Sequence, residues 1–253
     1  MPISLDIQTI EDIKTDLLTV STQKELSIPS FFLFGLRFHA LSIKETISTI
    51  DRFIFEKTPK FISFNNAHPV LLCHYDKELR AIFNRSHLSL ADGMSIVWSA
   101  RMLGHRLPER VAGPDLMPAL CAHSEKMGHK IFLMGGRWET LNQLSALMKS
   151  SWPRLKLVGM YSPPIANRFD EEENRKMINR INAAQPDILF VGLSCPKQER
   201  WISENLYRLK VPACLAVGAA FDFMTRRIPR APKWLRDHGL EWIHRVQEYE
   251  SSS

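Results

Sequence analysis

The fold of this protein is decided by the stretch SLADGMSIVWSARMLGHRLPERVAGPD, residues 89–115. A short apolar run ends abruptly at Asp92-Gly93, which predicts a turn at that point. Apolar residues then recur at the three- and four-residue steps of a helix, namely Ile96, Val97, Ala100 and Leu103. Asp92 is therefore expected where a strand ends and a helix begins. In open α/β sheets, ligands bind at this edge.

Arg110 follows Asp92 by eighteen positions and precedes a second loop, Gly113-Pro114-Asp115, that opens another helix. A carboxylate at a strand end can accept a proton, and an arginine can bind two phosphate oxygens at once. Gly93 would let the backbone turn and a ligand approach. The pair indicates a general base and an anion clamp. A structural alternative stays open, because an aspartate before a glycine is commonly a turn residue or helix cap.

Strand and helix patterns alternate along the rest of the chain. A capping-box pattern, Ser42 with Glu45, starts the helix expected at 42–57. This alternation predicts an α/β fold with a mostly parallel sheet and helices on both faces. The strands are expected at 31–36, 60–65, around 88, 130–134, 156–161, 187–193 and 213–218, and further helices through 79–83, 116–126 and 138–151.

Polar residues and glycines gather at the expected carboxyl ends of the strands. Ser63 and Asn65 close the strand 60–65, where they could bind a ligand or cap the next helix. Gly135-Gly136 stand between a strand and a helix, an arrangement that brings phosphates to helix amides. The three-glycine dinucleotide spacing is absent, which counts against a nucleotide-dependent oxidoreductase.

The composition is that of a globular protein with a basic end. The chain has 253 residues and a formal charge of +6, and no apolar run approaches the roughly 20 residues that span a bilayer. The acidic, polar start is unlike a secretory signal. Four cysteines without paired spacing indicate reduced core residues in a cytosolic protein. Residues 226–245 combine cations with tryptophans, which suits an anionic membrane surface or a phosphorylated ligand better than nucleic acid.

Five stretches in order resemble one known family. They are ADG at 91–93, RVAGPDL at 110–116, FLMGG at 132–136, VGLSCPKQERW at 191–201 and FDF…RAPKWLRDHGLEWIHR at 221–245. Over about residues 30–248 the chain resembles the WecG/TagA/CpsF glycosyltransferases. The resemblance implies a Rossmann-like fold and an inverting enzyme that moves a sugar from a UDP-sugar donor to an acceptor, in several members a polyprenyl-diphosphate-linked sugar. It also implies synthesis of a bacterial surface polysaccharide without a metal or other cofactor, and we find no Asp-x-Asp at a strand end.

The resemblance carries roles onto particular residues of this chain. Asp92 matches the aspartate taken as general base, and Arg110 matches the arginine thought to hold the leaving diphosphate. Asn65 and Gln198 match pocket residues, and Ser63 stands where a threonine is often found. These implied roles agree with the base and the clamp inferred above.

The C-terminal segment of such enzymes helps to close the site at the membrane, and Arg230 and Arg245 match its arginines. The simplest division of the chain, taken from its strand and helix pattern and its basic end, is an N-terminal extension (1–30), a Rossmann-like catalytic domain (31–220) and a basic, Trp-rich helical appendage (221–253). Two departures stand out. Arg226 occupies a position that is usually glycine, and the chain ends soon after Glu248, so its tail is either short by nature or cut.

The expected location is the cytoplasm, peripheral on the inner face of the cell membrane. The expected partners are the UDP-sugar, the lipid-linked acceptor and the anionic surface reached through residues 226–245, with no nucleic acid. Donor sugar, acceptor and oligomeric state stay open, a homo-oligomer included. The alternatives of another class are a nucleotide-binding protein and a non-catalytic scaffold that uses its basic end on membranes.

Overall fold

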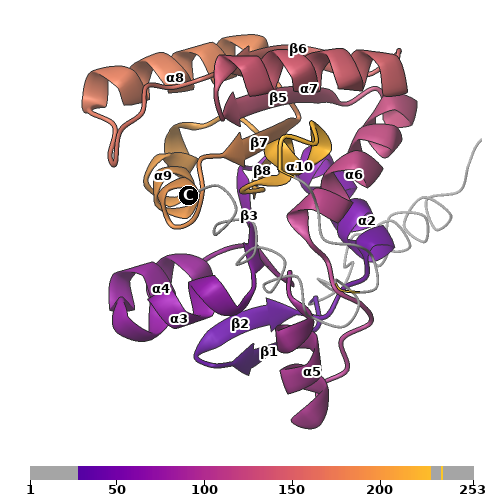
Figure 1. The fold of residues 1–253 in the computed structure, drawn as a ribbon, viewed down its shortest axis with the longest axis vertical. Coiled ribbons are helices and arrows are strands. Elements are labelled where there is room, and N and C mark those ends of the chain that lie inside the picture. Colours follow the sequence, from indigo (N-terminus) through magenta and orange to yellow (C-terminus); the bar gives the residue numbers. More distant parts are fainter. Residues whose placement is uncertain (1–27, 229–234, 236–253) are drawn as a thin grey trace, which may run out of the picture.

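The computed structural model describes residues 28–228 and residue 235 (Figure 1). Its centre is a six-stranded sheet in the order β4-β3-β8-β7-β5-β6, and all neighbouring strands run parallel. The predicted α/β fold with a parallel sheet is confirmed. The strands are β3 (Lys60–Asn65), β4 (Leu88–Ala91), β5 (Lys130–Gly135), β6 (Lys156–Tyr161), β7 (Ile188–Gly192) and β8 (Ala213–Ala216).

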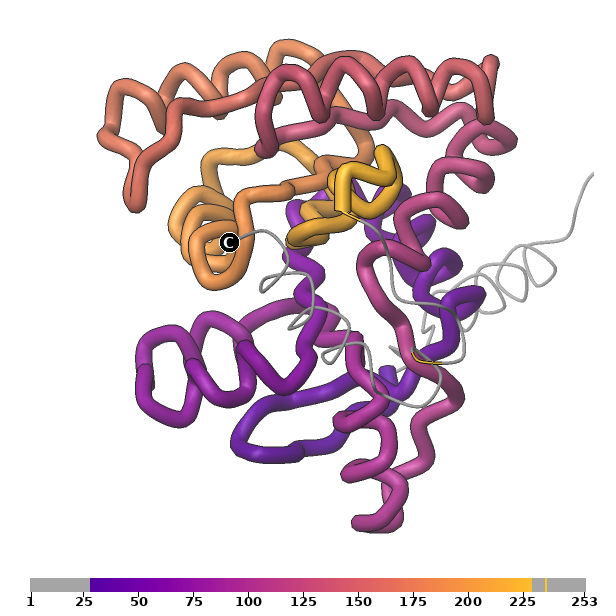
Figure 2. Tube along the Cα trace, viewed as in Figure 1, coloured from indigo at the N-terminus to yellow at the C-terminus, as the bar shows by residue number. Residues whose placement is uncertain are grey.

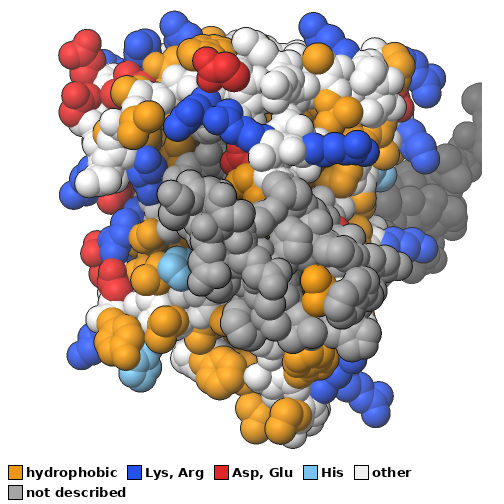
Figure 3. Space-filling view, viewed as in Figure 1, with side chains coloured by type: hydrophobic (Ala, Val, Ile, Leu, Met, Phe, Trp, Pro, Cys, Tyr) orange, Lys and Arg blue, Asp and Glu red, His pale blue; other side chains and the backbone are white. Residues whose placement is uncertain are grey.

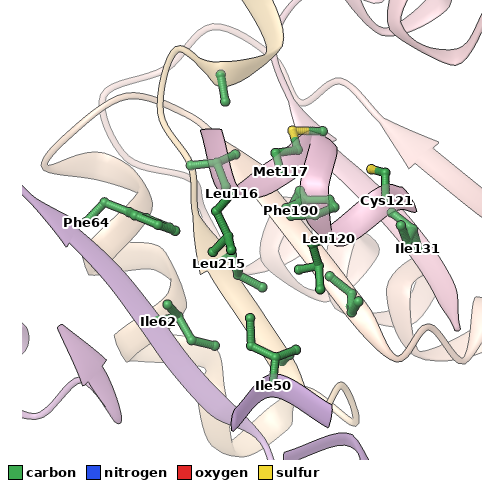
Figure 4. Packing of buried hydrophobic residues seen from close by; sticks show 14 of the residues in the cluster. Ile50, Ile62, Phe64, Leu116, Met117, Leu120, Cys121, Ile131, Phe190 and Leu215 are labelled. Atoms are coloured by element: carbon green, nitrogen blue, oxygen red, sulfur yellow. The ribbon is translucent and has the colours of Figure 1, made fainter. Parts of the chain in front are cut away.

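Helices cover both faces of this sheet, because successive strand residues point to opposite sides. Phe190 of β7 belongs to one buried cluster, and its neighbour Leu189 belongs to the other. Figure 4 shows Leu116 and Leu120 directed toward Leu215 of the sheet. One face packs against α2 (Ile43–Glu56), α6 (Gly113–Met127), α7 (Trp138–Ser151) and α10 (Ala220–Met224), and the other against α4 (Lys77–Asn84), α8 (Glu171–Ala184) and α9 (Lys197–Asn205).

The first expected strand, 31–36, is wrong: the chain forms a hairpin there. Strands β1 (Ser30–Leu33) and β2 (Leu36–His39) pair antiparallel. Phe34 and Gly35 between them have φ values of 52° and 77°. Two successive residues with positive φ are the mark of the tight turn that matches the twist of a hairpin. Phe34 is not one of the residues that usually signal this turn, so the sequence pattern concealed it.

The hairpin covers the open edge of β4. The Nδ1 atom of His39 accepts the N–H of Ser89 at 3.0 Å, and Arg37 donates to the carbonyl of Ser86 at 2.6 Å. Backbone groups of an edge strand otherwise invite pairing with another chain. Burial and the nearby Arg37 charge lower the pKa of His39 to about 4, so its ring is neutral and Nδ1 can accept.

Several helix boundaries follow from their caps. The capping box at Ser42 forms as predicted, with the Glu45 carboxylate accepting the Ser42 N–H at 2.8 Å. The helical run expected through residues 79–83 is broken into α3 (Ala67–Tyr75) and α4, because Asp76 caps α4 with its own side chain. Helix α5 (Met94–Met102) ends one residue earlier than its apolar pattern implied, and Leu103 is exposed, not buried.

Other expectations concern the two ends of the chain and its cysteines. The N-terminal extension and the basic appendage lie largely outside the described residues. Helix α10 crosses the expected boundary at 220, and Phe221 is part of the core.

All four cysteines carry free thiols, and all but Cys195 are buried. In the part of the chain that the structure describes, no helix has both the length and the apolar character to cross a bilayer.

Candidate functional site

The predicted site residues meet at the carboxyl edge of the sheet. Strands β3 and β4 end side by side, since Asn65 pairs with Ala91. The N–H of Asp92 continues this ladder by donating to the carbonyl of Asn65 at 3.0 Å. The loop that carries Arg110 is held against the same strand end, because the N–H of Val111 donates to the carbonyl of Ala91 at 2.9 Å. Backbone hydrogen bonds thus hold both Asp92 and the residue after Arg110 at the ends of these strands.

Asp92 and Arg110 face each other. The Nη1 atom of Arg110 lies 3.9 Å from Oδ1 of Asp92, and its Nη2 atom lies 2.5 Å from Oδ2 of Asp115. The side chains of Asp92 and Arg110 are 20% and 12% exposed. Both are therefore sheltered from bulk water without being sealed in the core. Asp115 was predicted only as a loop residue, and its place in the first turn of α6 lets it orient the guanidinium.

Asn66 lies beside Asp92 and also caps the following helix. Its Oδ1 accepts the N–H of His68 at 3.0 Å, which caps α3, while its Nδ2 lies 3.5 Å from Oδ2 of Asp92. A Cβ atom at Gly93 would come within 3.2 Å of the Cβ of Asn66. The glycine therefore allows β4 and α3 to approach closely, and one amide serves both as cap and as contact to the carboxylate.

Ser63 and Asn65 are fully buried beneath this edge. The hydroxyl of Ser63 donates to Oγ of Ser86 at 3.0 Å. Nδ2 of Asn65 donates to Oγ of Ser89 at 2.5 Å, and its Oδ1 has no partner among the described residues. The structure therefore places the side chains of Ser63 and Asn65 in the interior, bonded to other serine side chains.

Gly135 and Gly136 allow two strands and a helix to pack closely. Gly135 has φ of 111°, and a Cβ there would lie 2.3 Å from the carbonyl oxygen of Gly192. Only glycine fits this position. The N–H of Gly136 donates to that same oxygen at 3.0 Å, so this amide has its partner within the protein. The loop leads into α7, and the next backbone amides of the chain are those of the first turn of this helix.

The helices that begin near this edge without a side-chain cap include α5, α6 and α7. Their N-cap residues are Gly93 for α5, Ala112 for α6 and Arg137 for α7. A Cβ at Gly113 would lie 3.1 Å from the carbonyl oxygen of Val217, which places the start of α6 over the end of β8. Helix starts carry partial positive charge and amides that bind anions. Side chains cap α2, α3, α4 and α8.

Gln198 connects the start of α9 to the loop after β8. Its Oε1 accepts the N–H of Gly218 at 3.0 Å, and its Nε2 donates to the carbonyl of Ala216 at 3.1 Å. The side chain is 3% exposed. Gln198 therefore uses its side chain to hold the loop after β8 in place at the carboxyl edge.

Glu199, next to Gln198 in the first turn of α9, is a buried acid. Lys197 donates to the carbonyl of Ala166 at 2.7 Å, whereas Glu199 is 1% exposed and accepts from Nε2 of Gln198 at 2.9 Å. Burial raises the pKa of Glu199 to about 7. No local signal distinguishes a buried glutamate at a helix start from a solvated one.

The unusual Arg226 keeps the backbone conformation expected of a glycine. Its φ is 55°, in the left-handed region that favours glycine. Arg227 next to it donates to Oγ1 of Thr140 at the start of α7, at 3.1 Å. The first residues of the C-terminal segment therefore lie near the carboxyl edge. Arg230 and Arg245 lie outside the described residues.

A cavity of about 260 Å³ lies beside α9, away from Asp92. Its charged groups bind one another: Arg200 pairs with Asp76 and Glu78, and Arg168 pairs with Glu204. None of the predicted site residues contributes to its wall, so we do not take it as the site. Its lining consists of Glu78, Asn167, Arg168, Phe169, Asn174, Lys197, Arg200, Trp201 and Glu204.

The comparison with protein families agrees with this arrangement. The model described as "Glycosyl transferase WecG/TagA/CpsF family" matches residues 31–249, which is most of the chain. The matched region includes the whole sheet, Asp92, Arg110 and the segment after α10.

Proposed function

Because this chain belongs to the WecG/TagA/CpsF family of glycosyltransferases, which act in cell-surface polysaccharide synthesis, we propose the following reaction for it. The enzyme moves a hexose or an N-acetylhexosamine from a UDP-sugar to a polyprenyl-diphosphate-linked sugar. The observation that carries this proposal is the 3.9 Å approach of Arg110 to Asp92 at the carboxyl edge of the sheet. The carboxylate of Asp92 suits the attacking hydroxyl, and the guanidinium of Arg110 suits the leaving diphosphate.

Asp92 is the proposed general base. An acceptor hydroxyl becomes a good nucleophile only as its proton is removed, and a positioned carboxylate supplies about 10²–10⁴-fold for such a transfer. The hydroxyl oxygen forms the new bond to the anomeric carbon while its proton passes to Asp92. The bond from that carbon to the UDP oxygen breaks on the opposite side, so the anomeric configuration inverts.

Arg110 is the proposed partner of the leaving diphosphate. Its guanidinium stays charged at every relevant pH and can contact two phosphate oxygens. Asp115 holds Nη2 at 2.5 Å and so fixes the plane of the group. The uncapped starts of α5, α6 and α7 add amides with partial positive charge. This combination supports a reaction in which no metal ion neutralises the diphosphate.

An apolar surface next to the site supports a lipid-linked acceptor. Helix α5 begins two residues after Asp92, and its side chains Trp98 and Met102 are 43% and 87% exposed. Phe32 and Phe34 of the hairpin are also exposed. Figure 3 shows apolar side chains gathered at the lower edge of the view, over the hairpin and α5. We propose that this surface and residues 226–245 contact an anionic membrane from the cytoplasmic side.

A donor panel tests the reaction directly. Purified protein is incubated with UDP-linked glucose, N-acetylglucosamine and N-acetylmannosamine, together with a short polyprenyl-diphosphate glycoside, and released UDP is measured. We expect one donor to give UDP release that depends on the acceptor and persists in EDTA. Loss of release in EDTA would contradict metal independence, and absence of release with every donor would contradict the transferase reaction.

The same assay separates the alternatives. A non-catalytic scaffold would bind vesicles but release no UDP, and Asp92 changes would have no effect on it. A nucleotide-binding protein without transferase activity would bind UDP and leave every donor intact. The pairing of a carboxylate with an arginine at the sheet edge favours the transferase over both.

A further inference from the structure

Three side chains from two helices and a loop meet far from Asp92. Nε2 of His123 lies 2.7 Å from Oδ2 of Asp51, and Nε2 of His129 lies 3.0 Å from Oδ1 of the same carboxylate. The potential ligand atoms of all three residues lie within 4.8 Å of one another. In sequence, Asp51 is separated from the two histidines by more than seventy residues. This convergence is therefore a product of the fold.

The end of α6 brings the two histidines together. Gly128 closes α6 in the left-handed conformation, with φ of 76°, and donates its N–H to the carbonyl of Ser124 at 2.8 Å. The N–H of His129 donates to that same carbonyl at 3.1 Å. The chain thus turns back on the helix and places His129 near His123. Helices α2 and α6 lie side by side, which brings Asp51 within reach (Figure 2).

This cluster lies at the amino edge of the sheet, opposite to the candidate active site. His129 directly precedes β5, whereas Asp92 directly follows β4. A strand of six residues spans about 20 Å. The cluster is therefore outside the reach of a substrate bound at Asp92, and its role is independent of the proposed transfer reaction.

We propose that Asp51, His123 and His129 form a binding site for a Zn²⁺-like divalent metal ion. Two imidazole nitrogens and a carboxylate are ligands that zinc takes at about 2.0–2.2 Å. Tetrahedral ligands at such distances stand about 3.3 Å apart. The 2.7 and 3.0 Å separations of the two histidine nitrogens from the carboxylate oxygens would therefore open by about 0.3–0.6 Å around an ion, and all the ligand atoms already lie within 4.8 Å of one another. The nitrogen ligands favour Zn²⁺ over Mg²⁺, which prefers oxygen.

The surroundings suit an ion that enters from water. Side-chain exposures of 14% for His129, 28% for His123 and 30% for Asp51 leave a path to the site and room for a water ligand. A bound ion would join α2 to the end of α6 and to the start of β5. Such a link stabilises the folded chain, because metal binding to the folded state shifts the unfolding equilibrium.

Metal titration of the untagged, full-length protein tests this proposal. Calorimetry with Zn²⁺ measures stoichiometry and affinity, and Co²⁺ absorption reports the coordination geometry. We expect one ion per chain, an unfolding temperature that rises with Zn²⁺, and no comparable effect of Mg²⁺. The variants Asp51→Asn, His123→Gln and His129→Gln should each weaken Zn²⁺ binding at least about tenfold.

His74→Gln is the matched control, because His74 is an exposed histidine outside the cluster, and this variant should bind as the wild type does. Cysteines are weak competitors for Zn²⁺ binding. Cys195 is the least buried of the four, and burial raises the pKa even of its thiol. Zinc binding that survives all three cluster variants, or the absence of stoichiometric binding to the wild type, would overturn the proposal. In that case the Asp51 carboxylate only forms hydrogen bonds with the two histidines.

Discussion

Arg110 is shared unequally between two aspartates: its Nη2 atom lies 2.5 Å from Asp115, whereas its Nη1 atom lies 3.9 Å from Asp92. Asp115 therefore acts as the anchor of the guanidinium. Asp92 lies in the longer of the two contacts that the guanidinium makes with these aspartates. A base needs this looser contact, because it must bind the acceptor hydroxyl during the reaction.

The substitution Asp92→Asn should lower turnover by about 10²–10⁴-fold, because an amide cannot accept the hydroxyl proton. The affinity for UDP should change little, since the variant keeps the size of the side chain and leaves Arg110 and Asp115 in place. UDP release measures turnover, and calorimetry measures affinity. Near-normal turnover in this variant would exclude Asp92 as the base.

The substitution Arg110→Ala should weaken UDP binding by about 10- to 100-fold, because hydrogen bonds to charged groups contribute about 1.5–3 kcal/mol. Arg110→Lys should recover only part of this affinity, since an ammonium cannot make the two parallel contacts. Arg208→Ala is the control, because Arg208 pairs with Glu171, which starts α8 at the surface. Calorimetry with UDP that shows equal affinity for wild type and Arg110→Ala would contradict the clamp.

Glu199 should make the protein less stable as the pH rises. Burial raises its pKa from 4.5 to about 7, so the folded chain retains a proton that the unfolded chain releases. The resulting stability is fully present below about pH 4.5 and is lost as the pH rises through about 7. The glutamine in Glu199→Gln stays neutral at every pH. As the pH rises from about 4.5 to about 7, the free energy of unfolding of this variant should therefore rise relative to that of the wild type, by up to about 3 kcal/mol.

Urea unfolding of both proteins at a series of pH values measures this difference. Glu204→Gln changes an acid that pairs with Arg168 at the surface and should show no such shift. A constant difference between Glu199→Gln and the wild type from acid to neutral pH would show that Glu199 has the same pKa in the folded and unfolded chain, and would contradict this prediction.

His39 should act in the opposite direction. Burial and the charge of Arg37 lower its pKa from 6.5 to about 4, so the unfolded chain takes up a proton that the folded chain excludes. The stability that His39 supplies is present above about pH 6.5 and is lost as the pH falls through about 4. His39→Asn offers Oδ1 to the N–H of Ser89 without this titration. It should therefore lose less stability in acid than the wild type.

This comparison uses unfolding midpoints at about pH 7 and pH 5, read as differences between variant and wild type so that other groups cancel. His74→Asn changes an exposed histidine and serves as the control. Equal acid sensitivity of His39→Asn and the wild type would mean that His39 contributes nothing to it.

The apolar surface on α5 should contribute to membrane binding. In the double substitution Trp98→Ser and Met102→Ser, two large exposed side chains are removed, each of which stabilises a membrane contact by up to about 1.5–3 kcal/mol when buried. Sedimentation with vesicles that contain phosphatidylglycerol should show binding at least about tenfold weaker. Phe55→Ser, which removes an equally exposed apolar side chain from α2, should have no effect. Equal losses in both variants would argue against a specific surface.

Local patterns in the sequence determined most of the fold. The strand 60–65 and the helix 138–151 lie where alternation and periodicity predicted them. The capping box at Ser42 formed because its two partners are only three residues apart. The positions of Asp92 and Arg110 at an edge of the sheet also followed, because parallel strands place all their carboxyl ends together.

Only the tertiary structure decided which partners these residues have. Gln198 binds the loop at Gly218, Glu199 is buried beside it, and Asp115 orients Arg110. The convergence of Asp51 with His123 and His129 depends on the packing of α2 against α6. Periodicity and caps are interactions between near neighbours in the chain, so a sequence displays them. Burial and ion pairing depend on residues that are distant in sequence, and packing alone brings those residues together.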